Sequence, residues 1–265
     1  MGGTRSADTR PKGRGMITVR RQVIRALPAL MMVAGLTFTG CATGHTRPSA
    51  AAPSSSPVAS APAGATGAGG PALLLGEVKR ELAAMKETHY QHTTSVDEAI
   101  GKFFYDCSGM VDYALGRVLP DDAKALPTST LKRPLAGDIE LFLHDAVAQP
   151  VPGWQALTRV DQLGPGDLVA WQATEDSTTG DTGHVMVVLA APAPNPGRNG
   201  EWVVQVADST VSPHALDSRH RSQTGLGTGT IGLAVDGNGA PVGFYWQGGV
   251  SKNSRSTEIA LGRPL

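Results

Sequence analysis

Residues 42–71 consist almost entirely of Ala, Pro, Ser, Gly and Thr, with very few large apolar side chains. A segment of this composition cannot bury enough apolar surface to offset the conformational entropy lost on ordering. The 265-residue chain therefore has one long segment that can form a core, residues 73–265. That length suits a single globular domain. We expect one folded domain at 73–265 behind a flexible tether at 41–72.

The N-terminal residues have the pattern of an export signal. Residues 16–25 are rich in basic side chains and precede an apolar run at residues 26–38. The apolar run is too short to remain in a bilayer as a transmembrane helix. We therefore assign residues 1–40 to a signal peptide. Translation from Met16 is the alternative to Met1, because the fifteen residues before Met16 are polar.

Cys41 follows the small pair Thr39-Gly40 at the end of the apolar run. This arrangement resembles the lipobox of bacterial lipoproteins, in which the cysteine is lipidated, although Phe38 stands where Leu is usual. The resemblance implies a lipid anchor on Cys41 that holds the protein to a membrane in the cell envelope. The alternative is a secreted protein with a disulfide between Cys41 and Cys107, which an oxidising compartment favours.

The charge pattern argues against a nucleic-acid partner. The chain has 23 basic and 23 acidic residues, so its formal net charge is zero. No basic cluster outside the signal peptide is interleaved with aromatic residues. Proteins that bind nucleic acid need such clusters to neutralise phosphates.

Residues 104–113 (FYDCSGMVDY) place the only cysteine of the expected domain at the start of an amphipathic helix. Asp106 is a favourable N-cap, and apolar residues recur after Cys107 at helical spacing. A helix N-terminus favours thiolate over thiol, and its N–H groups can receive a developing oxyanion. Cys107 is therefore a candidate nucleophile. The alternative is a small buried core residue.

The remaining segments predict helices followed by antiparallel strands. We expect helices at residues 73–87 and 138–147, a loop at 90–105, and an insertion near 120–160. We expect strands at residues 168–171, 184–190, 202–208, 230–235 and 242–246, the last two forming a hairpin. The glycine-rich residues 225–230 resemble a phosphate-binding loop only in glycine content and are expected to be a flexible loop. This order predicts an α+β fold.

A thiolate hydrolase needs a base that is itself oriented by a third group. His184 is the best placed of the seven histidines, because it opens an apolar strand directly after a glycine. If that strand and the one at 201–208 form a hairpin centred near residue 196, His184 and Asp208 face one another. Asp208 would then hold the far ring nitrogen of His184.

Other roles remain open for both residues. A register slip of one residue would move the third role elsewhere, with His214 next in line. His184 is otherwise a hydrogen-bonded structural histidine, and Asp208 a residue of a strand-ending turn. His89 and His92 lie three apart without a third ligand at suitable spacing, so we expect no metal site.

Four motifs occur in order: DCSG at 106–109, PGDLV at 165–169, GH at 183–184, and a polar residue, Asp208, on the following strand. Together they resemble the NlpC-type cell-wall cysteine peptidases, which are papain-like, over roughly residues 75–250. The resemblance implies that the helix bearing Cys107 packs on a small antiparallel sheet. It also implies hydrolysis of amide bonds in peptidoglycan stem peptides through a thioester, without a cofactor.

The chain departs from that family in three respects. The third residue of the family is more often His, Asn or Gln than Asp, and the 77 positions between Cys107 and His184 are a long separation. The Tyr-x-Trp-Gly-Gly stretch that often precedes the cysteine helix is absent. Tyr90 is its closest counterpart, and Tyr90 and Ser108 are the expected oxyanion- or substrate-binding residues. An acyltransferase or amidase on the same scaffold, or an inactive envelope-binding lipoprotein, are the alternative functions.

Overall fold

The computed structural model describes residues 69–128, 132–174, 177 and 180–265. Its helices are α1 (Gly70–Ala84), α2 (Cys107–Val118), α3 (Pro120–Ala125) and α4 (Ala136–Asp145), with a 3-10 turn η1 (Val160–Gln162). The expected signal peptide, Cys41 and most of the expected tether lie outside the described residues. The expected domain boundary is slightly late, because α1 begins at Gly70 with a proline in its first turn.

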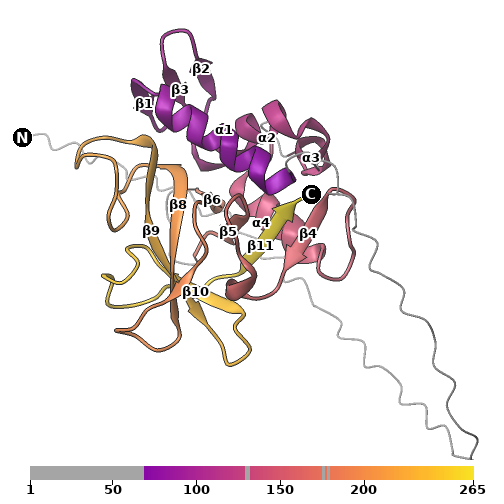
Figure 1. Ribbon diagram of the computed structural model, residues 1–265, viewed down its shortest axis with the longest axis vertical. Helices are drawn as coiled ribbons and strands as arrows, with labels where there is room; N and C mark the ends of the chain where they lie inside the picture. The colour runs from indigo at the N-terminus through magenta and orange to yellow at the C-terminus, as the bar shows by residue number, and fades with distance from the viewer. Residues whose placement is uncertain (1–68, 129–131, 175–176, 178–179) are drawn as a thin grey trace, which may run out of the picture. The chain divides into compact units, whose positions relative to one another are not determined.

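The main sheet has eight strands. They are β4 (Trp154–Leu157), β5 (Leu168–Gln172), β6 (Gly183–Val188), β7 (Ala193–Pro194), β8 (Glu201–Thr210), β9 (Gly225–Val235), β10 (Pro241–Tyr245) and β11 (Ile259–Pro264). Their order is β10-β9-β8-β6-β5-β11-β4 with β7 beside β8, and all neighbours are antiparallel (Figure 1). The α+β class is thus confirmed, but the sheet is much larger than the small sheet expected.

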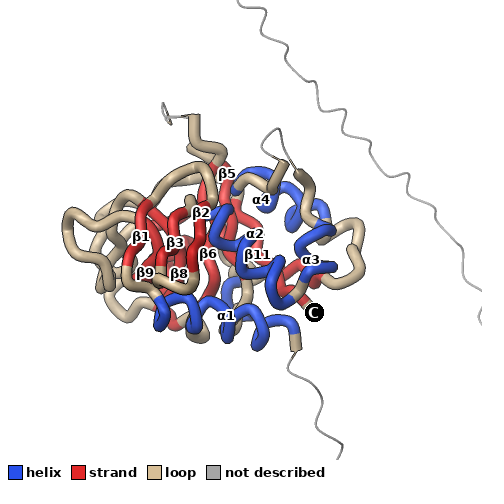
Figure 2. The backbone as a smooth tube through the Cα atoms, turned by 90° about the horizontal axis from the view of Figure 1, so that it is seen from above, coloured by secondary structure: helices blue, strands red, loops and turns tan. Residues whose placement is uncertain are grey.

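Successive residues of the central strands face opposite sides of this sheet. In β5, Leu168 and Ala170 belong to a hydrophobic cluster that includes buried residues of α1, α2 and α4. Val169 and Trp171 belong to a second cluster, made by η1 together with strands β4, β5, β6, β8, β9, β10 and β11. The helices therefore cover one face of the sheet, and Figure 2 shows α1, α2 and α4 beside the strands.

The sheet curls around the second cluster. Phe244 of β10 stacks on Trp171 of β5 with ring centroids 4.2 Å apart, although three strands separate β10 from β5 in the sheet order. Such curling is the accumulated effect of strand twist. His184 shares the enclosed face with Met186, and Asp208 shares it with Val206, because side chains alternate along each strand.

Two of the expected loops are instead β structure. Residues 90–105 contain β2 (Ser95–Asp97) and β3 (Lys102–Phe104), which form a small sheet with β1 (Glu87–His89). These strands are too short to show a periodic pattern. Residues 225–230 form the first half of β9, which pairs with β8 from residue 225 to residue 234. Glycine depletion in strands therefore misled the sequence-based prediction.

The glycines of β9 allow another segment to pack closely on the strand. A Cβ at Gly227 would lie 2.7 Å from the Arg219 side chain, and a Cβ at Gly229 would lie 2.6 Å from the Cβ of His214. The segment that contains His214 and Arg219 could not approach β9 so closely if the strand carried side chains at positions 227 and 229. Glycine in a strand interior commonly marks such a close approach.

The segment near 120–160 contributes to the core of the domain. It forms α3, α4 and β4, and the expected helix at 138–147 corresponds to α4. Ile139 and Leu143 of α4 are fully buried in the first cluster, while β4 pairs with β11 at the edge of the main sheet. Among the described residues, no helix is both long and apolar enough to cross a membrane.

Candidate active site

Cys107 is the first residue of α2, and its surroundings fix the helix start. The Asp106 Oδ1 atom accepts the backbone N–H of Gly109 at 2.7 Å, which confirms the predicted N-cap. The Ser209 hydroxyl of β8 donates to the Tyr105 carbonyl at 2.6 Å, so the residues just before the helix are tied to the sheet. The Cys107 thiol is free and only 4% exposed.

His184 lies in strand β6 of the main sheet, and its side chain is close to Cys107. It follows Gly183, which has a φ of +141°. A Cβ at Gly183 would lie 1.8 Å from the Trp171 carbonyl oxygen, so the position has no room for a side chain. The His184 Nε2 atom lies 2.6 Å from Asp208 Oδ2, and Cys107 is close enough to the ring to raise its pKa. Because Nε2 contacts the carboxylate, Nδ1 is the nitrogen left for the sulfur.

The charge state of His184 reflects these two contacts. Burial alone would lower its pKa, but the charge of Cys107 and the hydrogen bonds to Asp208 and Cys107 outweigh burial and raise the pKa to about 10. At neutral pH the ring is therefore favoured as an imidazolium beside the Asp208 carboxylate. A thiolate–imidazolium pair is the reactive form of a cysteine nucleophile.

The strand register that was predicted for His184 and Asp208 is wrong by two residues. Val187 pairs with Ala207 and Val188 with Val206, so the hairpin is not centred as expected. A shift of two residues keeps every side chain on the same face, whereas a shift of one would not. Asp208 therefore reaches His184 diagonally across the strands, which long side chains can do.

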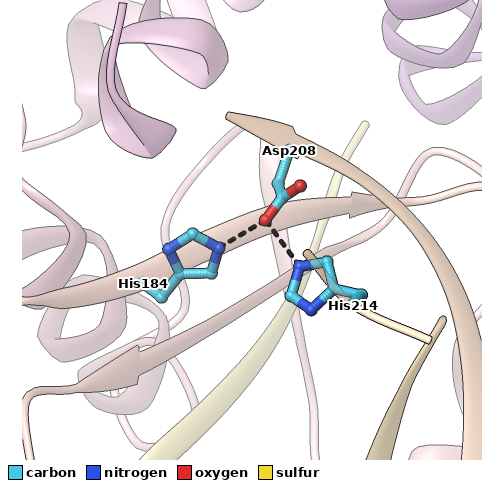
Figure 3. Close-up of side chains that lie close together, drawn as sticks. All are labelled: His184, Asp208 and His214. Atoms are coloured by element: carbon cyan, nitrogen blue, oxygen red, sulfur yellow. Dashed lines mark hydrogen bonds and ion pairs between the residues drawn. The ribbon is translucent and has the colours of Figure 1, made fainter. Parts of the chain in front are cut away.

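Asp208 is fully buried and accepts hydrogen bonds from three side chains. Its Oδ2 atom contacts His184 and, at 2.8 Å, the Nε2 atom of His214 (Figure 3). Its Oδ1 atom accepts from Arg219 Nη2 at 3.0 Å. Burial would raise the Asp208 pKa, but the charge of His214 and the two imidazole hydrogen bonds hold it well below its usual range. His214 thus contacts Asp208, and its ring centroid lies 6.3 Å from that of His184.

The side chains of His184, Asp208 and His214 could in principle hold a metal ion, since their ligand atoms lie within 4.8 Å of one another. The arrangement fits hydrogen bonding better. Both imidazoles contact the same carboxylate oxygen, and Arg219 already compensates the other one. A divalent cation would be placed beside a guanidinium, which is electrostatically unfavourable.

A cleft of about 540 Å³ lies beside His184. This volume is in the usual range for ligand sites. Its lining includes the aromatic side chains of Trp171, Phe244, Trp246 and Tyr90, together with Arg255. Most of the other lining residues are polar, so the cleft combines aromatic and hydrogen-bonding groups, which suits a peptide.

Tyr90 and Ser108 lie in different surroundings. Tyr90 lines the cleft, and burial together with the nearby charge of Cys107 raises its pKa, so the phenol remains a proton donor. The Ser108 hydroxyl is turned to Asp106 Oδ1 at 3.3 Å and accepts from Arg133 at 2.7 Å. Only its backbone N–H is therefore left for an oxyanion role.

Sequence reasoning missed two arginines of the site. Arg133 donates to Asp106 Oδ2 at 2.6 Å and thereby braces the N-cap of α2. It lies in an irregular segment, where no periodicity indicates which way a side chain points. Arg219 lies in a polar loop, where its own position gives no indication of a role. The sequence feature that could have indicated it is the alternation of glycines in β9, because Gly227 pairs directly with Asp208.

Comparison with known proteins identifies no family. No protein-family model matches the chain, and no solved structure matches it significantly. The chain is similar to an uncharacterized protein of Acanthamoeba polyphaga mimivirus, with 28% identity over 207 residues. The match covers 69% of this chain and 87% of the viral protein, whose name states no activity.

Proposed function

We propose that this protein is a cysteine hydrolase on a papain-like scaffold that cleaves amide bonds in peptidoglycan stem peptides. The observation that carries the proposal is the ion pair of His184 with Asp208 at 2.6 Å, with Cys107 at the start of α2 as an electrostatic neighbour of the same ring. A buried nucleophile, an oriented base and an ionised partner of that base are the three parts that covalent acyl transfer requires. The peptide substrate is supported by the cleft and by the resemblance of the four motifs to NlpC-type peptidases.

The reaction that these residues can perform has two steps. In the first, the Cys107 sulfur attacks the scissile carbonyl, and His184 gives its proton to the leaving amine, which departs as the thioester forms. The backbone N–H groups at the start of α2, with Tyr90 of the cleft lining, would stabilise the oxyanion. In the second step, His184 takes a proton from water as the water oxygen attacks the thioester carbonyl. The C–S bond then breaks, the peptide leaves as a carboxylic acid, and the thiolate–imidazolium pair is regenerated.

The test combines labelling with product analysis. The full chain is treated with an electrophilic thiol probe, and purified peptidoglycan is then digested and its fragments weighed. We expect labelling at Cys107 and release of shortened stem peptides. Cys107→Ala should abolish both, because loss of a nucleophile costs several orders of magnitude in rate. Cys41→Ser is the matched control and should leave digestion by solubilised protein unchanged.

Three other results would redirect the proposal. Digestion at the wild-type rate by Cys107→Ala would exclude Cys107 as the nucleophile. Fragments that carry a new amine instead of a free carboxylate would indicate an acyltransferase. Absence of both labelling and digestion would indicate an envelope-binding protein without activity. Lipidation of Cys41 is a separate part of the proposal, and intact mass of membrane-extracted protein would reveal the acyl chains.

A further inference from the structure

His214 is placed between two hydrogen-bond acceptors. Its Nδ1 atom lies 2.9 Å from the carbonyl oxygen of Trp246, and its Nε2 atom lies 2.8 Å from Asp208 Oδ2. A carbonyl and a carboxylate can only accept, so both contacts are hydrogen bonds only when both ring nitrogens carry a proton. The geometry therefore fits a buried imidazolium next to Asp208.

Arg219 approaches the same carboxylate from its other oxygen. Its side chain is 2% exposed, and Nη2 contacts Asp208 Oδ1 at 3.0 Å and Asp217 Oδ2 at 2.7 Å. The Nε atom contacts Asp217 Oδ1 at 2.8 Å, and Nη1 donates to the Gly225 carbonyl at 2.8 Å. These contacts hold the planar guanidinium in one orientation.

The charges of this cluster balance. Asp208 and Asp217 are the anions, and Arg219 and the imidazolium of His214 are the cations. The cluster is therefore close to neutral and does not oppose a thiolate–imidazolium pair at Cys107 and His184. A buried carboxylate with only His184 as its partner would instead carry uncompensated charge.

Stability alone does not explain these contacts. Replacing a buried ion pair with apolar groups of similar volume is often neutral or stabilising. The chain instead has glycines at 227 and 229, where side chains would clash with Arg219 and His214. The close packing of residues 211–224 on β9 thus brings the side chains of His214 and Arg219 into contact with Asp208.

We propose that His214 and Arg219 are positioning residues, which hold Asp208 ionised with its Oδ2 atom directed at His184. The proposal rests on the proposed role of Cys107 as a nucleophile. Neither residue contacts the reacting atoms, so both act through Asp208. Removing either one should leave His184 less well oriented and the thiolate–imidazolium pair less populated.

The experiment measures the rate of Cys107 alkylation by iodoacetamide against pH in the full chain, without any substrate. For Arg219→Gln and His214→Gln, we expect the pH of half-maximal rate to rise by about one unit, which is a ~10-fold loss of the reactive pair. Arg219→Lys should recover part of the shift, because it keeps the charge without the fork. Arg221→Gln, an exposed arginine of the same segment, is the matched control and should not shift the profile.

A double-mutant cycle shows whether the effect passes through Asp208. In an Asp208→Asn background, Arg219→Gln should cause no further shift, because coupled residues are not additive. Gly227→Ala should displace Arg219 without changing any charge and should shift the profile in the same direction, whereas Gly237→Ala, which has open space around it, should not.

Three outcomes would overturn the proposal. The first is an unchanged profile in folded Arg219→Gln and His214→Gln. The second is an undiminished Arg219→Gln shift in the Asp208→Asn background. The third is unfolding of every Arg219, His214 and Gly227 variant, which would make the contacts structural. If the variants shift the pH profile of alkylation as expected but the protein cleaves no peptidoglycan, the proposed function is contradicted and this inference stands.

Discussion

Asp208 is the side chain on which most contacts of the candidate site converge. Two imidazoles and one guanidinium donate to it, and no part of it is exposed. Its lowered pKa means that it stays ionised across the pH range in which cysteine hydrolases operate. The carboxylate can therefore fix the tautomer of His184 and stabilise the imidazolium form.

Asp208→Ala should reduce the rate of peptidoglycan cleavage by a factor on the order of 10 to 10³, less than His184→Ala. The loss is smaller than the ~10⁴-fold effect in a serine hydrolase, because a thiolate–imidazolium pair can form without the third residue. Asp208→Asn should recover part of the activity, since an amide oxygen can still accept the ring N–H. Initial rates with purified peptidoglycan would show this order.

A silent Asp208→Ala together with an inactive His214→Ala would contradict the assignment. In that case His214 would be the residue that orients the base. Thermal melting of each variant is the control, because Asp208 also pairs with Arg219.

The residues that could be predicted from the sequence lie at the ends of regular elements. Cys107 starts a helix with clear apolar periodicity, and His184 starts an apolar strand, so their placement follows from local pattern. Asp208 was identified through a register that is two residues off. It still faces the same side of the sheet as His184, because side chains along a strand alternate with a period of two residues. Arg133 and Arg219 lie in irregular segments, where orientation depends on tertiary contacts.

At the scale of elements, helices α1, α2 and α4 and strands β5, β6, β8 and β10 were predictable, whereas α3, β4, β7, β11 and the first half of β9 were not. The strands at 168–172 and 183–188 are buried on both faces and appear as apolar runs. The first half of β9 has the composition of a loop because its glycines make room for a neighbouring segment. The strand β11 has Gly262 and Pro264 within six residues, which conceals it from propensity arguments.

The helix α1 is joined to the site by a buried carboxyl. Glu81 is fully buried, and its Oε2 atom accepts the Tyr105 hydroxyl at 2.6 Å, two residues before Cys107. Its Oε1 atom has no hydrogen-bond partner among the described residues. Burial raises the Glu81 pKa to about 8, despite the opposing hydrogen bond from Tyr105. The folded protein therefore holds a proton on Glu81 at neutral pH.

This raised pKa predicts how stability depends on pH. An unfolded Glu loses its proton near pH ~4.3, so between that pH and about 8 only the folded state keeps the proton. The Glu81 contribution to stability is therefore full below pH ~4.3 and is lost as the pH rises toward 8. Glu81→Gln removes this loss. It should stabilise the protein at pH 8 by a few kcal/mol, because ~1.4 kcal/mol is lost for each pH unit between the unfolded and folded pKa values. At pH 5 the gain should be much smaller.

Urea unfolding at the two pH values would test this expectation. Glu87→Gln, at an exposed carboxyl in β1, is the matched control and should not change the pH dependence. An equal effect of Glu81→Gln at pH 5 and pH 8 would mean that Glu81 is ionised in the folded protein.

At the scale of the whole domain, the strand with the highest residue numbers occupies an interior position of the sheet. The strand β11 pairs with β5 on one side and with β4 on the other. It carries Leu261 into the second hydrophobic cluster and Ala260 into the first. Residues 259–264 therefore join the two parts of the sheet.

Deletion of residues 259–265 should make the protein insoluble or unfolded. Without β11, the apolar strand β5 has an open edge and β4 has no partner in the sheet. Open edges of apolar strands invite pairing between molecules. Removal of Leu265 alone, whose side chain is 60% exposed, should be tolerated. Soluble yield and gel filtration would distinguish the two truncations, and a soluble, monomeric 1–258 fragment would contradict the expectation.

The interior position of β11 also decides when the domain can fold during synthesis. While the ribosome is still adding residues, β5 and β4 have no strand between them, even after every helix has emerged. The pairings of β11 with β4 join residues about a hundred positions apart, and contacts of such separation form slowly. A nascent chain therefore cannot close this sheet before residues 259–264 have left the ribosome.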